Sequence, residues 1–495
     1  MRRLGVVVLA TLSGCGLVGP DYERPPPATP PPLAFKETGD SYFRPAMPRD
    51  AIDRGKWWSM YGDPALDQLT AQVDVSNQTL KASEAAYRQA VALVRQSQSA
   101  LYPTIGYTGS VVQQSGRTGS STATVSVGSP TAQISVGATL SWEIDVWGRI
   151  RRTIESDSAA AQASAADLMA ARLSAQSSLV SNYFQLRISD ARKRVLEESV
   201  AAYGRSLEIV RNQFDAGTVS RVDLAQAQTQ YDQTRAQLVA EGVNRALFEH
   251  AIAALVGRTP AEVSVTAAPP PKDVPTVDAG IPSALLERRP DIASAERQMQ
   301  AANAQIGVAQ AAYYPDITLN ASLNFASTVL STLFQISNGV WSFGPALAGT
   351  LIDGGSRAAQ VESARANYDR TVATYRQTVI TAFQQVEDAL VQQRILEQQE
   401  QVQLSAVAAA RDAERLALNQ YRAGTVPYTT VVTTQTAALQ NELSLLTVRQ
   451  SRLVASATLV TALGGGWRDV ELPPPAPIAG QQTSRELKKK NWWPF

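Results

Sequence analysis

The side chains that most enzymes use for nucleophilic or metal chemistry are almost absent from this chain. Its 495 residues contain one cysteine, Cys15, and one histidine, His250. These two residues cannot supply a disulfide within the chain, a zinc site of several cysteines and histidines, or most triads built on a mobile histidine base. His250 falls in an apolar helical stretch, which favours a structural or surface role. The composition predicts that the protein is not an enzyme and needs no metal or cofactor.

Cys15 is the residue whose surroundings predict a chemical modification. A basic start, an apolar run over residues 4–12 and Leu-Ser-Gly-Cys at residues 12–15 follow one another. This order is typical of a secretory signal peptide. The last four residues resemble the bacterial lipobox, in which the cysteine becomes the acylated first residue of the mature protein. We predict that residues 1–14 are removed and that Cys15 is lipidated. Position 16 is not aspartate, so the signal for retention in the inner membrane is missing.

Polar residues gather at two similar turns. One turn reads Gln-Phe-Asp-Ala-Gly-Thr-Val-Ser over residues 213–220, and the other reads Gln-Tyr-Arg-Ala-Gly-Thr-Val-Pro over residues 420–427. Gly217 and Gly424 are predicted C-terminal helix caps, each joining a long helix to a returning one. Ser220 and Asp223 form a capping-box pattern with Asp where Glu or Gln is usual. One interpretation of Asp223 is an acid favoured by the dipole of the helix it begins.

The two turns belong to a duplication that covers most of the chain. Equivalent positions of the turns lie 207 residues apart, and the similar segments 101–106 and 313–318 lie 212 residues apart. Residues 144–149 (Ile-Asp-Val-Trp-Gly-Arg) return as 352–357 (Ile-Asp-Gly-Gly-Ser-Arg). Two copies at so long a period are too few for a solenoid of short repeats. They indicate one body whose related halves complete a closed object.

Each copy contains a long helical segment. Residues 149–214 include no proline and one glycine, and such a helix would be about 100 Å long. Apolar residues recur at alternating spacings of four and three, or every seven positions: Leu196, Val200, Tyr203, Leu207, Val210 and Phe214 in the first copy, and Val432, Leu439, Leu446, Leu453 and Val460 in the second. These repeats predict narrow coiled-coil seams. Because the other faces are small and neutral, we interpret the helices as the wall of a tube.

Each copy also contains extended segments. Residues 131–145 alternate apolar and polar side chains, and residues 317–325 repeat the alternation. This period predicts strands with one apolar and one polar face, of a length that suits a transmembrane β-barrel. Residues 105–113 are the expected partner of the first strand, with a loop at 115–130. Four strands per chain cannot close a barrel, so the chain must oligomerise, and three chains would give twelve strands.

Composition and charge narrow the class of protein. The chain is 44% hydrophobic and 18% charged, with a net charge of +1. The hydrophobic fraction is sufficient for a packed core, and the near-zero net charge gives no indication of nucleic-acid binding. A proline-rich stretch at residues 25–32 predicts an extended tether after the lipid anchor.

The chain resembles the TolC-like outer-membrane factors, in particular their lipoprotein branch (NodT/OprM-like), the exit ducts of tripartite efflux pumps. The resemblance covers nearly the whole chain. Its carriers are the segments Gly19-Pro-Asp-Tyr-Glu-Arg-Pro25, Trp57-Trp-Ser-Met-Tyr-Gly-Asp-Pro-Ala-Leu66, Trp142-Glu-Ile-Asp-Val-Trp-Gly-Arg149 and Leu285-Leu-Glu-Arg-Arg-Pro-Asp-Ile292 with Ala295 and Glu296.

The resemblance implies a mainly α fold with a β-barrel. A homotrimer would form a twelve-stranded outer-membrane barrel, a periplasmic α-helical barrel and a small mixed equatorial domain. The implied partners are a periplasmic adaptor, an inner-membrane pump (of RND type) and outer-membrane lipid. The expected divisions are a signal peptide at 1–14, an anchor, tether and equatorial segment at 15–62, a first repeat at 63–258 with a hairpin at about 104–145, a linker at 259–282, a second repeat at 283–465 with a hairpin at about 316–352, and an equatorial segment and tail at 466–495.

The resemblance also implies a gate at the turns. In the family, an acid at the position of Asp223 joins a polar network that holds the helices shut, and Tyr421 matches the family's tyrosine at this tip. The family's arginine falls on Val426, which leaves Arg422 as the nearest candidate. The carboxylates that ring the family's constriction fall on Thr430 and Thr433, a change that predicts weaker cation selectivity.

Two other functions remain open at this point. The same fold serves as the exit duct of type I protein secretion, although the lipobox and the Gly-Pro-Asp-Tyr segment favour efflux. A periplasmic coiled-coil scaffold would explain the helices but not the alternating strands. Nothing in the sequence identifies the exported substrate.

Overall fold

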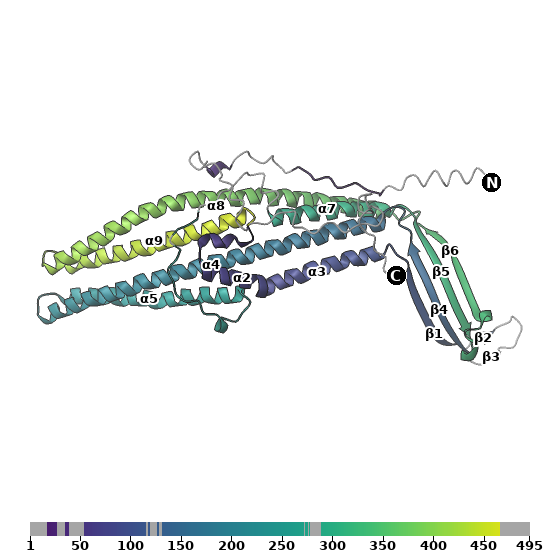
Figure 1. The fold of residues 1–495 in the computed structure, drawn as a ribbon, viewed down its shortest axis with the longest axis horizontal. Coiled ribbons are helices and arrows are strands. Elements are labelled where there is room, and N and C mark those ends of the chain that lie inside the picture. The colour runs from purple at the N-terminus through teal and green to yellow at the C-terminus, as the bar shows by residue number, and fades with distance from the viewer. Residues whose placement is uncertain are drawn as a thin grey trace.

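The structure is an elongated assembly of helices with a β-sheet at one end (Figure 1). The computed structural model describes residues 17–26, 35–38, 54–114, 117–118, 126–127, 131–271, 273–275, 277 and 289–465. The predicted signal peptide, the predicted lipidation site Cys15, most of the proline-rich stretch and the C-terminal segment from residue 466 lie outside these residues.

The helices repeat the duplication almost residue for residue. The two long helices α4 (Arg149–Asp215) and α8 (Ser356–Arg422) have 67 residues each. The return helices α5 (Arg221–Leu255) and α9 (Tyr428–Ala462) have 35 residues each, and α3 (Gln78–Ser99) and α7 (Pro290–Ala311) have 22 each. The predicted rods are therefore confirmed, at a length of about 100 Å each for α4 and α8.

An aspartate and a left-handed glycine begin each long helix. The carboxylate of Asp145 accepts hydrogen bonds from the backbone N–H groups of Ile150 and Arg151 at 3.0 and 2.9 Å. Asp353 accepts in the same way from Arg357 N–H at 3.1 Å. The glycines before the helices have φ of 83° and 93°, a conformation that side chains other than glycine rarely adopt. The sequence thus turns sharply from strand into helix at equivalent points of both copies.

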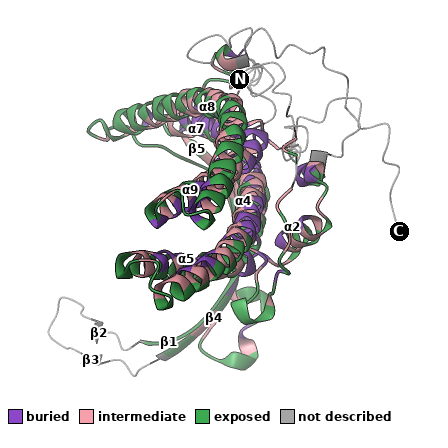
Figure 2. Ribbon diagram, turned by 90° about the vertical axis from the view of Figure 1, so that its left-hand side faces the viewer, coloured by how far each residue is buried: buried purple, intermediate pink, exposed green. Residues whose placement is uncertain are grey.

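The predicted seven-residue seams are buried between helices. Leu196, Tyr203 and Val210 of α4 are all at most 3% exposed. Leu439 of α9 packs against Leu196 and Tyr203, because α9 lies beside α4 in the half of the rods that is farther from the sheet. In the half nearer the sheet, α7 lies between α4 and α8. The helices thus form one curved wall rather than a bundle with a central core (Figure 2).

Four long strands make one antiparallel sheet. They are β1 (Thr104–Gln114), β4 (Thr131–Glu143), β5 (Asp316–Ser327) and β6 (Gly339–Ala348), in the order β1-β4-β5-β6. A short ribbon of β2 (Arg117–Thr118) and β3 (Ser126–Val127) stands apart, and the 3-10 turns η6 (Leu330–Thr332) and η7 (Ile336–Asn338) connect β5 to β6. Among the described residues, β1 and β6 each lack a partner on their outer edge.

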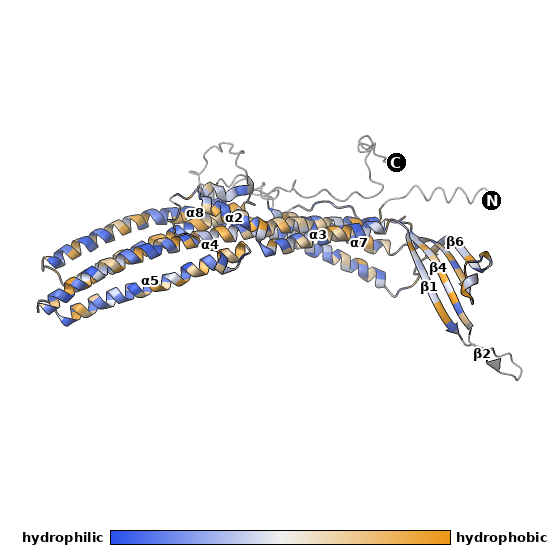
Figure 3. Cartoon of the chain, turned by 60° about the horizontal axis from the view of Figure 1, so that its bottom comes forward, coloured by the Kyte–Doolittle hydropathy of each residue, from blue (hydrophilic) through white to orange (hydrophobic). Residues whose placement is uncertain are grey.

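Hydrophilic and hydrophobic residues alternate along the strands (Figure 3), and the strand register aligns residues of one kind across the sheet. Ala138 pairs with Leu323, and Leu323 pairs with Trp341, so apolar side chains align across the sheet. The neighbouring positions are mostly serine, threonine, asparagine or glycine, as in the pairs Ser110 with Ser135 and Ser322 with Ser342, with Val340 as an exception. None of the described helices carries an apolar stretch long enough to cross a membrane.

Short segments cover the convex side of the helical wall (Figure 2). They are the 3-10 turns η2 (Lys36–Thr38), η3 (Arg54–Tyr61) and η4 (Pro260–Glu262), and the helix α2 (Pro64–Ser76). Trp57 and Trp58 are buried here, and the ring of Tyr61 meets the ring of Phe184 edge to face at 4.7 Å. Asp63 caps α2 through Ala65 N–H at 2.9 Å. These contacts give the aromatic and acidic residues of the Trp57–Leu66 segment a structural role.

Residues 17–24, here called the N-terminal strap, cross α4, α7 and α8. The guanidinium of Arg152, whose side chain is only 2% exposed, donates to the carbonyl oxygens of Val18 and Gly19 at 3.1 and 3.2 Å and to Asp21 at 2.8 Å. Gly19 has φ of 98°, and a Cβ at this position would lie 2.4 Å from Gly307 Cα. The backbone of the Gly-Pro-Asp segment therefore packs closely against α7 and α4, which fixes the position of the chain shortly after Cys15.

Candidate functional site: the tips of the two helical hairpins

The helical hairpins end in two equivalent turns. Gly217 and Gly424 have φ of 74° and 75°. At each turn the glycine N–H donates to the carbonyl three residues back at 2.9 Å, and the following threonine donates through both N–H and Oγ1 to the carbonyl five residues back. This arrangement satisfies carbonyl groups that the end of a helix leaves free. The predicted glycine caps are confirmed as structural features.

The two return helices begin differently. Ser220 and Asp223 form the predicted capping box: Asp223 N–H donates to Ser220 Oγ at 3.2 Å, and Ser220 N–H donates to Asp223 Oδ2 at 3.1 Å. Ser220 Oγ–H also donates to the same carboxylate oxygen at 2.7 Å. In the second copy, Pro427 stands at the cap position and no side chain caps α9. The first tip is thus tied more firmly than the second.

A small apolar core joins the two tips. Its buried members come from all four helices: Val210, Ala227, Tyr421, Tyr428 and Val431. The rings of Tyr421 and Tyr428 meet edge to face with 5.1 Å between their centroids. Such a pair stabilises by about 0.5–1.5 kcal/mol beyond the area that it buries. The tips of one chain are therefore packed against each other rather than lying as two separate hairpins.

Tyr421 also makes a polar contact between the hairpins. Its hydroxyl donates to Gln213 Oε1 at 2.6 Å, across 208 positions of sequence. Burial raises the pKa of Tyr421, and the negative charge of Asp223 raises it further. Burial also raises the pKa of Tyr428 to about 12, with a smaller contribution from Tyr421. Both phenols are therefore neutral at physiological pH, and that of Tyr421 acts as a hydrogen-bond donor.

The remaining predicted gate residues do not join this contact within one chain. Asp223 is engaged by its own capping box, and Arg422 is exposed at the end of α8 and forms no ion pair with any residue that the structure describes. Gln213 and Tyr428 are the tip residues that sequence reasoning missed. Gln213 carries a weak signal in the sequence, because Gln213 and Gln420 occupy the same place in the repeated turn.

The two threonines lie along the start of α9. Thr433 is exposed, and its Oγ1 donates to the carbonyl of Thr429 at 2.8 Å. Thr430 is half-buried, and its carbonyl accepts from Thr434 Oγ1 at 3.0 Å. A hydroxyl that donates to its own helix offers only lone pairs and a methyl group to the surroundings. These positions consequently carry no fixed charge at the tip.

Charges reappear where the sheet joins the helices. Arg149 makes two hydrogen bonds to the carboxylate of Glu143, and its Nε lies 3.9 Å from Asp316 Oδ1. The indole N–H groups of Trp142 and Trp147 donate to the carbonyls of Leu101 and Pro315, both at 2.9 Å. These hydrogen bonds and the ion pair fix the strands to the helices. The described residues contain no group of three or more side chains that could hold a metal ion.

Comparisons with known proteins give one consistent result. The family described as "Outer membrane efflux protein" matches residues 69–258 and 281–465. The probable efflux pump outer membrane protein TtgC of Pseudomonas putida is 31% identical over 491 residues, which is 97% of either chain. The cation efflux system protein CusC of Escherichia coli is 29% identical over 468 residues, 94% of this chain and 99% of that protein. The solved structure of the outer-membrane channel OprN superposes with a TM-score of 0.80 at 28% identity, covering 91% of this chain and 99% of that one.

Proposed function

Because the chain belongs to the outer membrane efflux protein family, we propose that it releases small organic molecules that an inner-membrane pump and a periplasmic adaptor deliver to it. Membership makes the protein an outer-membrane channel of a tripartite efflux system that extends into the periplasm. Three chains form one twelve-stranded barrel, continued by one helical barrel. The substrate class, the pump class, the gate and the anchor are the parts proposed here.

The observation that carries this function is the unbroken wall from strand to helix. β4 ends at Glu143 and α4 begins at Arg149, and the Arg149 guanidinium holds the Glu143 carboxylate across the junction. The polar face of the sheet is proposed to continue into the concave side of the helices as one surface. A surface that spans an apolar membrane layer and then continues as helices of about 100 Å can carry a solute across both compartments.

The substrates are proposed from the relatives and from the lining. Relatives are described as exporting toluene, antibiotics and cations, so one fold serves chemically different solutes. The polar face of the sheet in this chain consists mainly of small uncharged side chains and glycine. Such a lining discriminates little between solutes, which supports selection by an inner-membrane pump, for which the RND type is proposed.

We propose that the hairpin tips close the duct in its resting state. In one chain the hydroxyl of Tyr421 is already used by Gln213, and Asp223 keeps one carboxylate oxygen outside its capping box. Arg422 is exposed on the neighbouring tip of the same chain. A bond from Arg422 to Asp223 of an adjacent chain would be repeated three times around the axis, and a hydrogen bond to a charged group contributes about 1.5–3 kcal/mol. Thr430 and Thr433 would line the constriction without charge.

Cys15 is proposed as an auxiliary lipid anchor. The strap begins two residues after it and is held by the buried Arg152. Because the barrel inserts through its own apolar face, the acyl chains would add to membrane attachment without being its only source. Mass spectrometry of the mature protein should show an acylated cysteine and no residues 1–14, whereas an intact N-terminal methionine would exclude processing.

An export assay tests the proposed function. Cells that lack their endogenous outer-membrane efflux channels should accumulate a fluorescent small organic dye, and expression of this chain with a matching pump and adaptor should lower the accumulation. With the pump inactivated, the chain should no longer lower the dye accumulation, even in a variant whose duct is opened by deletion of both tip turns. Secretion of a polypeptide without any effect on the dye would instead support the protein-secretion alternative.

A further inference from the structure

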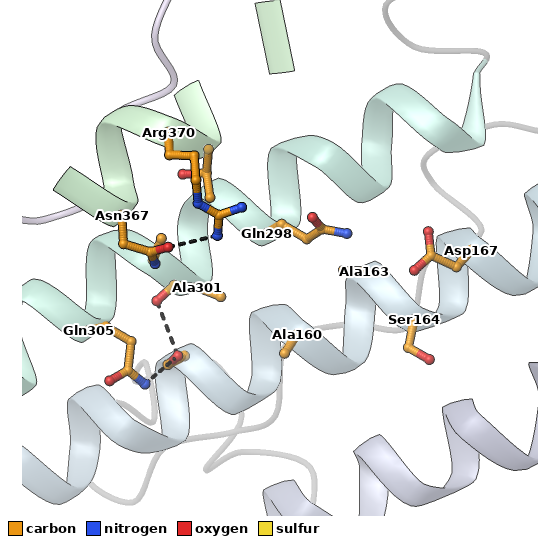
Figure 4. A pocket seen from close by; sticks show the side chains of 12 residues that line it. Ala160, Ala163, Ser164, Asp167, Gln298, Ala301, Gln305, Asn367 and Arg370 are labelled. Atoms are coloured by element: carbon orange, nitrogen blue, oxygen red, sulfur yellow. Dashed lines mark hydrogen bonds between the residues drawn. The ribbon is translucent and has the colours of Figure 1, made fainter. Parts of the chain in front are cut away.

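A pocket of about 410 Å³ lies between α4, α7 and α8, in the half of the helical wall nearer the sheet (Figure 4). It is separate from the hairpin tips. Alanines from α4 and α7 form its floor, and polar side chains stand around it: Asp167, Gln298, Gln305, Asn367 and Arg370. Its volume falls in the range that accommodates molecules of a few hundred daltons.

The face of α7 that lines the pocket is opposite the one that holds the N-terminal strap. Asn303 Nδ2 donates to the carbonyl of Pro20 at 3.0 Å, so Asn303 faces the strap. Ala301 and Gln305 line the pocket. Each is two positions from Asn303, and two positions turn a helix by about 200°. The strap and the pocket therefore lie on opposite sides of the wall.

The strap side is the outside of the wall. Tyr22 of the strap packs with Tyr375 of α8, and Phe35 packs with Val386, three turns farther along the same face. Phe35 leads into the segments that cover the convex side in Figure 2. The pocket consequently faces the concave side, which is the interior of the duct in the trimer.

The pocket holds two charges without an ion-pair partner in the described part of the chain. Arg370 reaches from α8 toward the α7 glutamines, and its Nη2 donates to Asn367 Oδ1 at 2.8 Å, a neutral acceptor (Figure 4). Asp167 projects from α4 at the other end, with neither a hydrogen bond nor an ion pair among the described residues. α7 lies between α4 and α8, and neighbouring helix axes are about 8–10 Å apart, so the α4 and α8 axes are about 16–20 Å apart. Because both side chains extend into the pocket between these helices, the two charges are separated by on the order of 10 Å.

The amide side chains between the charges are only partly used. Gln305 Nε2 donates to Ser156 Oγ at 2.8 Å, and Gln298 Nε2 donates to Ser294 Oγ at 3.2 Å. Their carbonyl oxygens have no partner in the described residues and can accept from a ligand. The pocket thus offers an anion-binding end on α8, a cation-binding end on α4, and acceptors above a floor of methyl groups.

We propose that this pocket is a weak resting site in the duct for amphoteric molecules that carry an ammonium and a carboxylate about 10 Å apart. Arg370 and Asn367 would hold the carboxylate, and Asp167 would hold the ammonium. The site is open to water, so each charge contributes little and the solute leaves again, as passage through a channel requires. The inference rests on the concave side being the route of export, and it adds a lumenal contact that the export function does not itself require.

Three matched probes test the site on the detergent-solubilised trimer by saturation-transfer NMR. The first is the tripeptide alanyl-alanyl-phenylalanine, whose termini are about 10 Å apart when extended. The second is its N-acetyl form, which keeps only the carboxylate, and the third is its C-terminal amide, which keeps only the ammonium. The variants are Asp167→Asn and Arg370→Gln, with Glu84→Gln on the exposed edge helix α3 as a control for loss of one charge elsewhere.

We expect the free tripeptide to bind most tightly, with up to about a fivefold loss on either blocking reaction. In Asp167→Asn, N-acetylation should no longer matter, and in Arg370→Gln amidation should no longer matter; Glu84→Gln should behave as wild type. Equal binding of the three probes to wild type, or unchanged ratios in both variants, would overturn the proposal. Probe binding is measured without a pump, so it is independent of export. If the probes bind as expected but the export assay fails, the proposed function is contradicted and the binding site is not.

Discussion

The hydroxyl of Tyr421 donates a 2.6 Å hydrogen bond to Oε1 of Gln213, and this bond joins the tip of the second helical hairpin to the tip of the first. The two residues occupy α8 and α4, and the apolar core around Tyr428 and Val431 lies beneath them. Separation of the two tips of a chain would therefore break this bond and expose the apolar core between them. The polar bond and the tyrosine pair set how firmly they are coupled.

Replacing Tyr421 by phenylalanine should loosen the tips. The variant keeps the ring and its contact with Tyr428 but loses the bond to Gln213, which is worth about 0.5–1.5 kcal/mol in each of three chains. We expect more frequent opening and a higher mean conductance in planar bilayers. Tyr428→Phe is the matched control, because the Tyr428 hydroxyl has no hydrogen bond among the described residues. An equal effect of both substitutions would assign the coupling to ring packing.

Asp223→Ala and Arg422→Ala should each raise the leak of the resting duct. Loss of Asp223 also removes half of a capping box, which costs about 1 kcal/mol. Asp223→Asn, which can still accept the cap bonds, separates the cap from the charge. Leak is measured as uptake of a large hydrophilic dye by cells without a pump. Wild-type uptake in both alanine variants would remove these residues from the gate.

The uncharged start of α9 should leave the duct weakly selective between cations and anions. Thr430→Asp and Thr433→Asp would place carboxylates at the positions where the resembling family carries them. A ring of three added charges attracts cations and repels anions at short range. The reversal potential in a salt gradient should shift toward that of a cation-selective pore in both variants. Strong cation selectivity of the wild type would show that another ring of charges controls permeation.

Gly307→Ala should destabilise the trimer, although alanine normally favours a helix by about 1 kcal/mol over glycine. A Cβ at Gly307 would lie 2.8 Å from the carbonyl oxygen of Val18, so the N-terminal strap would have to move. Gly204→Ala is the control, because its Cβ would meet only the Tyr231 ring at 3.4 Å. Thermal unfolding should show a lower midpoint for Gly307→Ala and an unchanged or higher one for Gly204→Ala. The same sign for both would mean that the strap contributes nothing.

Asp353 should make the start of α8 sensitive to acid. The side-chain and backbone bonds from Arg357, followed by that from Gly355, lower the pKa of Asp353 from 3.8 to about 2. A depressed folded-state pKa gives stability that is fully present above the unfolded pKa and is lost as the pH falls from about 4 toward 2. The difference in unfolding midpoint between wild type and Asp353→Ala should shrink over that interval. A constant difference down to pH 2 would show that the carboxylate charge is irrelevant.

The features predicted from sequence are those that local patterns determine. The glycine caps at 217 and 424 follow from a repeated Ala-Gly-Thr, and the capping box of Ser220 and Asp223 follows from spacing alone. The seams and strand alternation also follow from short periods. All of these depend on neighbours within about ten positions.

The features that sequence reasoning missed depend on contacts between distant segments. Arg152 lies on a helix where arginine is usually exposed, yet it is buried because the strap, more than a hundred positions earlier, supplies its acceptors. Gln213 finds Tyr421 only once the hairpins pack together. The sequence repeat pairs Arg149 with Arg357. In the structure, however, Gly148 and Gly355 are the equivalent residues before the long helices, so the two arginines are one position out of step. Arg149 accordingly binds Glu143, whereas Arg357 binds Asp353.

The protein is proposed to be a continuous duct that its helical tips close at rest. Recording a purified trimer in a planar bilayer, with trypsin added to one side at a time, tests this claim directly. Arg221 and Arg422 are exposed at the tips, so trypsin on the helical side should cut there. We expect low conductance before cleavage and a sustained rise only after addition on the helical side. High conductance before cleavage, or a rise only after addition on the barrel side, would contradict it.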